Sequence, residues 1–231
     1  MTGPAEGGLT GEGSGLAEVR LTGEGRPAGG GRADGADRPA GSSPVPDAPV
    51  IDEVVAVPTA VQMRRLGEQL ADHLRAGDLV VLSGPLGAGK TTLTQGIGAG
   101  LGVRGAVTSP TFVIARVHPS LSAGPDLVHA DAYRLGRRAE VDDLDLDADL
   151  ATAVTVVEWG EGLVEDLAPS FLSVRIETDE PPAPHAGSPG GQAASTDEAD
   201  IRRTVHVSGW GDRWHGAAVA ASIREALTSL G

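Results

Sequence analysis

Residues 78–92 read DLVVLSGPLGAGKTT, and this stretch decides the fold. Its first part, Asp78–Gly84, is an apolar run typical of a buried strand, and a helix is predicted to follow over Thr91–Gly102. Between them, Gly84–Thr91 fits G-x-x-x-x-G-K-[ST], the pattern of a loop that binds phosphate groups. Glycines let the backbone N–H groups of such a loop turn toward a phosphate, and the helix N-terminus adds a partial positive charge. The stretch therefore predicts a nucleotide-binding α/β domain.

The lysine of this loop stands out against the rest of the chain. Seventeen of the eighteen basic residues are arginine, and Lys90 is the only lysine. A compact ammonium suits phosphate oxygens, so a sequence strongly biased toward arginine keeps lysine where that property is needed. We expect Lys90 to reach the outer phosphates of a nucleotide and the Thr91 hydroxyl to hold Mg²⁺. A glycine-rich turn with an incidental lysine is the weaker interpretation.

The composition argues against several other classes of protein. The net charge is −14, which disfavours broad contact with nucleic-acid phosphates, although work beside RNA through a partner stays possible. No cysteine is present, so disulfides and zinc–thiolate sites are excluded. The first residues do not resemble a signal peptide, and no apolar run approaches the roughly 20 residues that span a bilayer. The expectation is a soluble, intracellular protein.

The pattern of elements divides the chain into a tail and one domain. Residues 1–50 are rich in Gly and Pro and poor in large apolar groups, so we expect a disordered tail. Residues 51–231 are expected to form the phosphate-loop domain, with a flexible insertion at 179–200. Besides the strand and helix already described, the patterns predict a helix from Thr59 to near Gly77, a last helix over Trp214–Leu230, and strands over Glu53–Val57, Thr111–His118, Leu127–Ala130, Ala153–Glu158, Leu172–Glu177 and Arg203–Val207. This alternation predicts an α/β P-loop NTPase fold, a mostly parallel sheet flanked by helices.

Two carboxylates follow apolar strands. Asp131 comes at the end of LVHAD and Glu158 at the end of VTVVE. Strand carboxyl ends face the ligand crevice in open α/β sheets, so both acids can converge on the nucleotide. A single acid at a strand end is more often a solvated boundary residue, but a phosphate loop in the same sheet favours the functional interpretation.

A segment after the first helix, TSPTF at Thr108–Phe112, lies where a switch segment is expected. The hydroxyls of Ser109 and Thr111 could sense a γ-phosphate or Mg²⁺; a plain proline-containing loop is the equal alternative. Three of the six aromatic residues, Phe112, Tyr133 and Trp159, sit in this segment and the two strand ends. Their placement favours a common site or partner surface.

The motifs GPLGAGKTT, TSPTF, HADAYRL and VVEW, in this order and spacing, resemble the TsaE family, formerly called YjeE. The resemblance covers about residues 51–178. It implies a Mg²⁺-dependent cytoplasmic ATPase that works with the TsaB and TsaD proteins in modifying adenosine 37 of tRNAs that read codons beginning with A. The family does not transfer the threonylcarbamoyl group itself; its ATPase is thought to reset the complex. It implies contact with tRNA only through the complex, and none with DNA or membranes.

The resemblance also implies roles for individual residues. Lys90 and Glu158 are the catalytic pair, with Glu158 promoting the attack of water and Trp159 packed beside the site. Ser109 and Thr111 belong to the switch segment, and Thr91 and Asp131 bind the metal. The ATP phosphates are held by Gly87, Ala88, Gly89, Lys90, Thr91 and Thr92.

Two other functions remain open from the sequence. One is an interaction module that docks according to its nucleotide state, with hydrolysis incidental. The other is a small-molecule kinase, which usually needs a mobile, Arg-rich lid that the sequence lacks. Arg134 could act as an arginine finger, but a salt-bridging or interface role is favoured. The acidic run at 141–150 lacks the central glycine and terminal glutamate of a calcium loop.

Overall fold

The computed structural model describes residues 48–110, 115–135, 150–179 and 202–228 of the 231-residue chain. The tail at 1–47, nearly all of the insertion and acidic run, and Thr111 with Phe112 lie outside the described residues. The predictions for those segments stay predictions.

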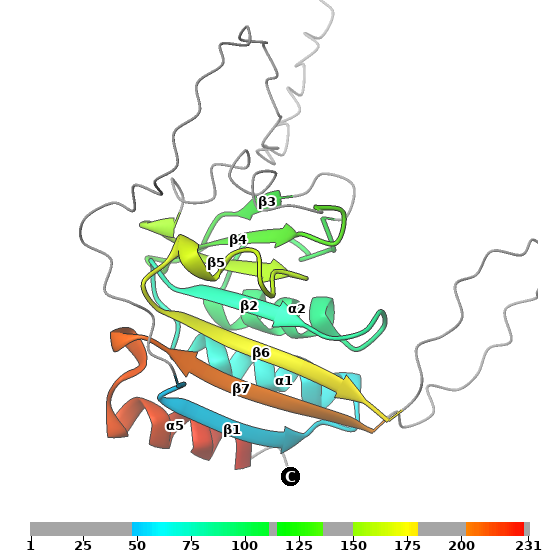
Figure 1. Cartoon of the computed structure of the whole chain (residues 1–231). Helices are drawn as coiled ribbons and strands as arrows, with labels where there is room; N and C mark the ends of the chain where they lie inside the picture. Colours follow the sequence, from blue (N-terminus) through cyan, green and yellow to red (C-terminus); the bar gives the residue numbers. More distant parts are fainter. Residues whose placement is uncertain (1–47, 111–114, 136–149, 180–201, 229–231) are drawn as a thin grey trace, which may run out of the picture.

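Seven strands in the described part of the chain form one sheet (Figure 1). In chain order they are β1 (Ile51–Ala56), β2 (Leu79–Ser83), β3 (Ala115–His118), β4 (Asp126–Asp131), β5 (Ala153–Glu158), β6 (Phe171–Thr178) and β7 (Arg203–Trp210). Their order across the sheet is β1-β7-β6-β2-β5-β4-β3. Each strand overlaps one of the predicted strands, so these predictions are confirmed, except that residues 111–114 of the strand predicted over Thr111–His118 lie outside the described residues.

The strands in the centre of the sheet are parallel, so their carboxyl ends lie at one edge. β6, β2, β5 and β4 are parallel neighbours, whereas β3 and β7 run antiparallel to the strands they pair with. β1 is antiparallel to β7 and so runs with the central four strands. The prediction of a mostly parallel α/β sheet is confirmed. The carboxyl ends of β2, β4 and β5 lie at the same edge, and the phosphate loop leaves the sheet there.

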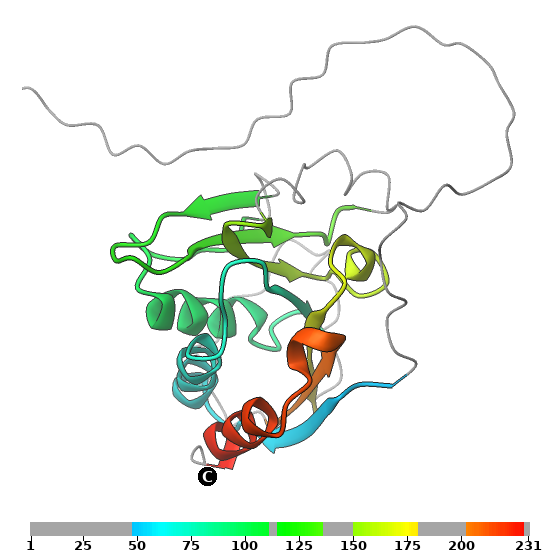
Figure 2. The ribbon, with the colours of Figure 1, turned by 90° about the vertical axis from the view of Figure 1, so that its left-hand side faces the viewer.

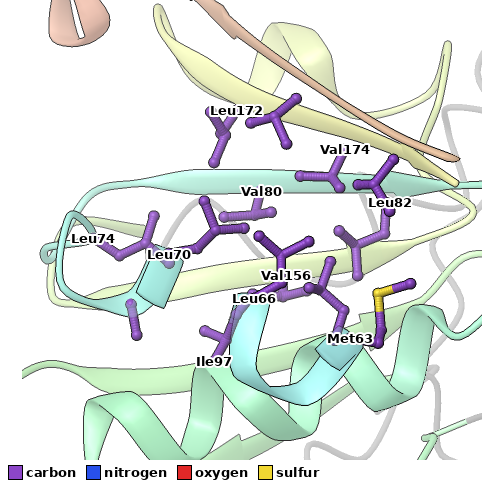
Figure 3. Packing of buried hydrophobic residues seen from close by; sticks show 14 of the residues in the cluster. Met63, Leu66, Leu70, Leu74, Val80, Leu82, Ile97, Val156, Leu172 and Val174 are labelled. Atoms are coloured by element: carbon purple, nitrogen blue, oxygen red, sulfur yellow. The ribbon is translucent and has the colours of Figure 1, made fainter. Parts of the chain in front are cut away.

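The helices α1 (Ala60–Ala71), α2 (Lys90–Leu101) and α5 (Ala217–Thr228) pack on one face of the sheet (Figure 2). The sequence begins α1 with a cap, since Thr59 Oγ1 accepts a hydrogen bond from the Gln62 N–H at 3.1 Å. Figure 3 shows Met63, Leu66 and Leu70 of α1 packing toward the apolar side chains of the central strands. Burial of these side chains stabilises the packing of α1 against the sheet.

Glycines let α1 and α2 approach very closely. A Cβ on Gly96 would lie 2.0 Å from the Arg64 carbonyl oxygen, and one on Gly67 would lie 2.3 Å from that of Leu93. No side chain fits in either position. The glycine-rich sequence of α2 therefore serves helix packing as well as the phosphate loop before it.

The opposite face of the sheet has its own apolar cluster. It includes Leu79, Val81 and Val157 from the central strands, together with Val164 and Ala168 from the segment after β5. This segment carries the short 3-10 helix η1 (Glu165–Leu167). In the described part of the chain, the cover of this face comes from such loop segments, and α1, α2 and α5 all lie on the other face.

Two helix boundaries differ from the predictions. α1 ends at Ala71, not near Gly77. The N–H groups of His73 and Leu74 donate to the carbonyl oxygens three residues earlier, so the chain continues in tight turns and not as an α-helix. The last helix starts at Ala217, not at Trp214. Trp214 is instead buried in the 3-10 helix η2 (Asp212–Trp214).

An ion pair joins the start of β2 to η2, and its loss is expected to destabilise the fold. Asp78 is buried, and its Oδ1 and Oδ2 each lie 2.9 Å from a guanidinium nitrogen of Arg213. Arg213 also donates to the His73 carbonyl at 2.7 Å and stacks over the Trp214 ring. Changing Asp78→Ala leaves a largely buried guanidinium without its carboxylate, so the free energy of unfolding in urea should fall by about 3 kcal/mol.

The matched control for that change is Asp52→Ala. Asp52 is exposed and accepts a hydrogen bond from Ser208 at 3.2 Å. Its loss should change the free energy of unfolding by less than about 0.5 kcal/mol. Equal effects of the two substitutions would contradict the structural role given to the Asp78–Arg213 pair.

Candidate nucleotide-binding site

The phosphate loop is built on glycines with positive φ. Gly84, Gly87 and Gly89 have φ of 137°, 80° and 110°. A Cβ on Gly84 would also lie 2.3 Å from the Ile176 carbonyl oxygen, so the loop can leave β2 only through glycine. α2 begins immediately afterwards at Lys90, and its N-cap, Gly89, provides no side chain to occupy the first-turn N–H groups. These N–H groups are therefore available to an anion.

A cavity of about 400 Å³ lies beside this loop. It unites the loop with the carboxyl ends of β4 and β5 and with the segment after α2. Its lining residues are Leu86, Gly87, Gly89, Lys90, Thr91, Thr92, Ser109, Asp131, Tyr133, Glu158 and Trp159. Most of the predicted site residues thus share one cavity. Ala88 is buried beneath the loop instead, and Thr111 lies outside the described residues.

Lys90 is 5% exposed and points into the loop. Its Nζ donates to the carbonyl oxygens of Gly84 at 2.7 Å and Pro85 at 2.9 Å. Nζ also lies 3.7 Å from the centre of the Trp159 ring. Burial lowers the pKa of Lys90 to about 8, against the opposing effect of the carboxylates of Glu158 and Asp131. The ammonium is thus held at the loop in a position where phosphate oxygens would favour its charged form.

Glu158 lies at the end of β5 and is 3% exposed. The Thr91 hydroxyl lies 2.9 Å from its Oε1 and 3.1 Å from its Oε2. The Nε2 atom of His129 lies 2.8 Å from Oε1. Our sequence reasoning missed His129. The signal available was a polar residue inside the apolar run LVHAD, two positions before Asp131 and so on the same face of β4.

Asp131 ends β4 directly beside Glu158 in the sheet register. Its Oδ2 accepts from the Ser109 hydroxyl at 3.3 Å, and its Oδ1 accepts from the Tyr133 N–H at 2.9 Å. The segment predicted to act as a switch therefore contacts the carboxylate predicted to bind the metal. The two acids stand side by side at the cavity wall.

Two aromatic rings close one side of the cavity. The Trp159 and Tyr133 ring centres are 5.0 Å apart, and their planes are inclined at 56°. Trp159 has φ of 61°, a conformation that costs a non-glycine residue about 1–3 kcal/mol. The backbone N–H of Trp159 donates to the Leu82 carbonyl at 2.8 Å, and this bond stabilises the turn. This turn places the indole against Lys90. Arg134, by contrast, is exposed and does not line the cavity.

The polar groups of the cavity fit Mg²⁺ bound together with a nucleotide. In the described residues, no cluster of three or more His, Cys, Asp or Glu side chains could hold a metal alone. The cavity does offer the Thr91 hydroxyl and the carboxylates of Asp131 and Glu158. Mg²⁺ usually takes one or two carboxylates and completes its ligands with water and substrate phosphates. A magnesium nucleotide therefore suits this site better than a free metal ion.

None of the helices in the described ranges has the length and apolar character needed to cross a membrane.

The chain is also similar in sequence to known proteins. The family model for "Threonylcarbamoyl adenosine biosynthesis protein TsaE" matches residues 57–183. The tRNA threonylcarbamoyladenosine biosynthesis protein TsaE of Streptomyces coelicolor is 59% identical over 159 residues, covering 68% of this chain and 97% of that protein. The TsaE protein of Mycobacterium bovis is 55% identical over 119 residues, covering 48% of this chain and 71% of that protein.

A solved structure shares the fold. The crystal structure of Bacillus subtilis YdiB superposes with a TM-score of 0.51, covering 77% of this chain and 95% of that protein. The identity is 24%, so this likeness speaks for the fold alone.

Proposed function

Because the chain belongs to the TsaE family of threonylcarbamoyladenosine biosynthesis proteins, we propose that it is a Mg²⁺-dependent ATPase of this pathway. The observation that carries the proposal is the cavity that joins a glycine-rich loop, Lys90, the Thr91 hydroxyl and two buried carboxylates. The phosphate-binding loop, the lysine, the metal ligands and the water-positioning acid of a phosphate-loop hydrolase each have a counterpart there.

The position of each residue in the cavity indicates its role in the reaction. The N–H groups of the loop and of the first turn of α2 bind the phosphates, and Lys90 neutralises their outer charge. Thr91 and Asp131 would hold Mg²⁺, which supplies positive charge against the phosphate oxygens. Glu158 positions water for attack, because it is buried at the cavity wall beside Thr91. Positioning matters more than full proton abstraction, since an unperturbed carboxylate is a weak base.

The proposal extends to partners. The protein acts with TsaB and TsaD in modifying adenosine 37 of tRNAs that read codons beginning with A, and ATP hydrolysis resets the complex for another turnover. The threonylcarbamoyl transfer itself belongs to the partners. A net charge of −14 disfavours direct contact with tRNA or DNA, so in this proposal tRNA is contacted only through those partners. The site of action is the cytoplasm.

A second candidate is a docking module controlled by the nucleotide state. Leu86 and Tyr133, at the mouth of the cavity, are 80% and 55% exposed. Exposed apolar side chains beside a bound nucleotide could form a surface that a partner recognises only in one nucleotide state. In that case hydrolysis would be incidental to docking.

The pathway proposal is tested by depleting the protein in cells and measuring the nucleosides of their tRNA by mass spectrometry. Threonylcarbamoyladenosine should fall on depletion and return when the full chain is expressed again, because the proposed ATPase is required for repeated turnover. Other modified nucleosides of the same tRNA are the internal control and should stay constant. An unchanged level of threonylcarbamoyladenosine in fully depleted cells would contradict the proposal.

A further inference from the structure

A buried histidine stands directly behind the proposed catalytic carboxylate. His129 is 0% exposed on β4, and its Nε2 lies 2.8 Å from Oε1 of Glu158 on the neighbouring strand β5. The parallel register places His129 opposite Val156, so its ring reaches Glu158 diagonally across the two strands. His129 is not a lining residue of the cavity, and any role in the reaction must act through Glu158.

We propose that His129 is a positioning residue that fixes the Glu158 carboxylate for the attack of water. This inference rests on the hydrolysis proposed above. It assigns a specific tautomer to the imidazole and a specific task to each oxygen of the carboxylate.

The tautomer follows from the hydrogen bonds. An ionised carboxylate only accepts, so the contact requires a hydrogen on Nε2 of His129. The Nδ1 atom is buried and has no hydrogen-bond partner among the described residues. A hydrogen on Nδ1 would leave a buried donor unsatisfied and set the Nε2 lone pair against the carboxylate. The Nε2–H tautomer avoids both costs.

The two oxygens of Glu158 are used unequally. Oε1 accepts from His129 at 2.8 Å and from Thr91 at 2.9 Å, whereas Oε2 has only the longer Thr91 contact at 3.1 Å. His129 therefore holds Oε1 in place, and Oε2, which has a single and longer contact, is the oxygen that receives a water. Without His129 the carboxylate can rotate about its last side-chain bond, and the water loses its fixed acceptor.

A second buried histidine provides the matched control. His118 on β3 is 1% exposed, and its ring lies on the same face of the sheet as His129. Burial, the nearby His129 and Arg116 lower its pKa, with a smaller opposing effect from the Arg104 backbone. It resembles His129 in residue type and burial, but its only indicated partner among the described residues is the Arg104 backbone, and the bond to Glu158 is made by His129.

The test compares steady-state ATP hydrolysis in the full chain and its variants. His129→Leu should lower kcat by about 100-fold, because the carboxylate is no longer fixed, while KM for ATP stays within about twofold. His129→Gln can place an amide N–H at the reach of Nε2 and should recover kcat to within about tenfold of wild type. His129→Asn is too short for that bond and should behave like His129→Leu. His118→Leu should leave kcat unchanged.

A second readout does not depend on hydrolysis. The ¹⁵N NMR spectrum of the histidine rings in the nucleotide-free wild-type chain should show the Nε2–H tautomer for His129, and Glu158→Gln should shift that signal. An Nδ1–H tautomer would overturn the proposal, whatever the stability of the variants. Wild-type kcat in His129→Leu, or an equal loss in His118→Leu, would also overturn it. A wild-type chain with no hydrolysis at all would instead contradict the proposed ATPase.

Discussion

Replacing Lys90 with methionine should weaken binding of ATP by about 100-fold, or roughly 3 kcal/mol, the upper range for hydrogen bonds to a charged group. Lys90 is the only lysine of the chain, and its Nζ is held at the loop by the carbonyl oxygens of Gly84 and Pro85. Methionine matches the length of the side chain but carries no charge to place against phosphate oxygens. Calorimetric titration with ATP and Mg²⁺ measures the loss.

The pH dependence of binding distinguishes the charge of Lys90 from its packing. Its pKa in the nucleotide-free protein is about 8, and phosphate oxygens favour the ammonium, so binding raises that pKa. ATP affinity of the wild type should therefore stay level below pH 8 and fall above it, where binding must take up a proton.

The control for this pH dependence is Lys90→Arg. A guanidinium keeps its charge at every pH of the titration, so the affinity that remains in this variant should not fall between about pH 8 and 10. A wild-type affinity that stays level across this range would show that the Lys90 charge does not limit binding.

Much of the fold could be predicted because its determinants are local. The central strands β2 and β5 are short, mostly apolar runs, and the glycine spacing of the phosphate loop restricts what can follow β2. The prediction was wrong where tertiary contacts decide. Trp214 fits the start of a helix by sequence, but its side chain is buried against Gly209. A Cβ on Gly209 would lie 3.0 Å from the Trp214 Cβ. The chain therefore enters α5 only after a 3-10 turn.

The site residues could likewise be predicted where the sequence pattern is local, but not where tertiary contacts decide. The phosphate loop, Asp131 and Glu158 could be proposed from strand ends, and the structure brings them to one cavity. The contacts of Glu158 with Thr91 and His129 depend on the strand order β2-β5-β4, which the sequence pattern does not contain. The stacking of Trp159 on Lys90 likewise depends on a positive φ that no propensity favours for tryptophan.

Changing Glu158→Gln should lower kcat for ATP hydrolysis by about 100-fold or more, the range expected for loss of a general base or water-positioning carboxylate. ATP affinity should change by less than about threefold, because glutamine keeps the size of the side chain and an oxygen that can accept from Thr91. Single-turnover hydrolysis and equilibrium binding separate the two effects.

The matched control is Glu161→Gln in the turn that follows. Glu161 is exposed, pairs with the exposed Arg175 at 3.4 Å and does not line the nucleotide cavity, so kcat should stay at the wild-type value. Expression of each variant in depleted cells then decides between the two functions. If Glu158→Gln binds ATP but fails to restore threonylcarbamoyladenosine while Glu161→Gln restores it, hydrolysis is what the pathway requires. Full restoration by Glu158→Gln would instead establish nucleotide-dependent docking, since the variant retains the bound ATP and the exposed Leu86 and Tyr133 beside it.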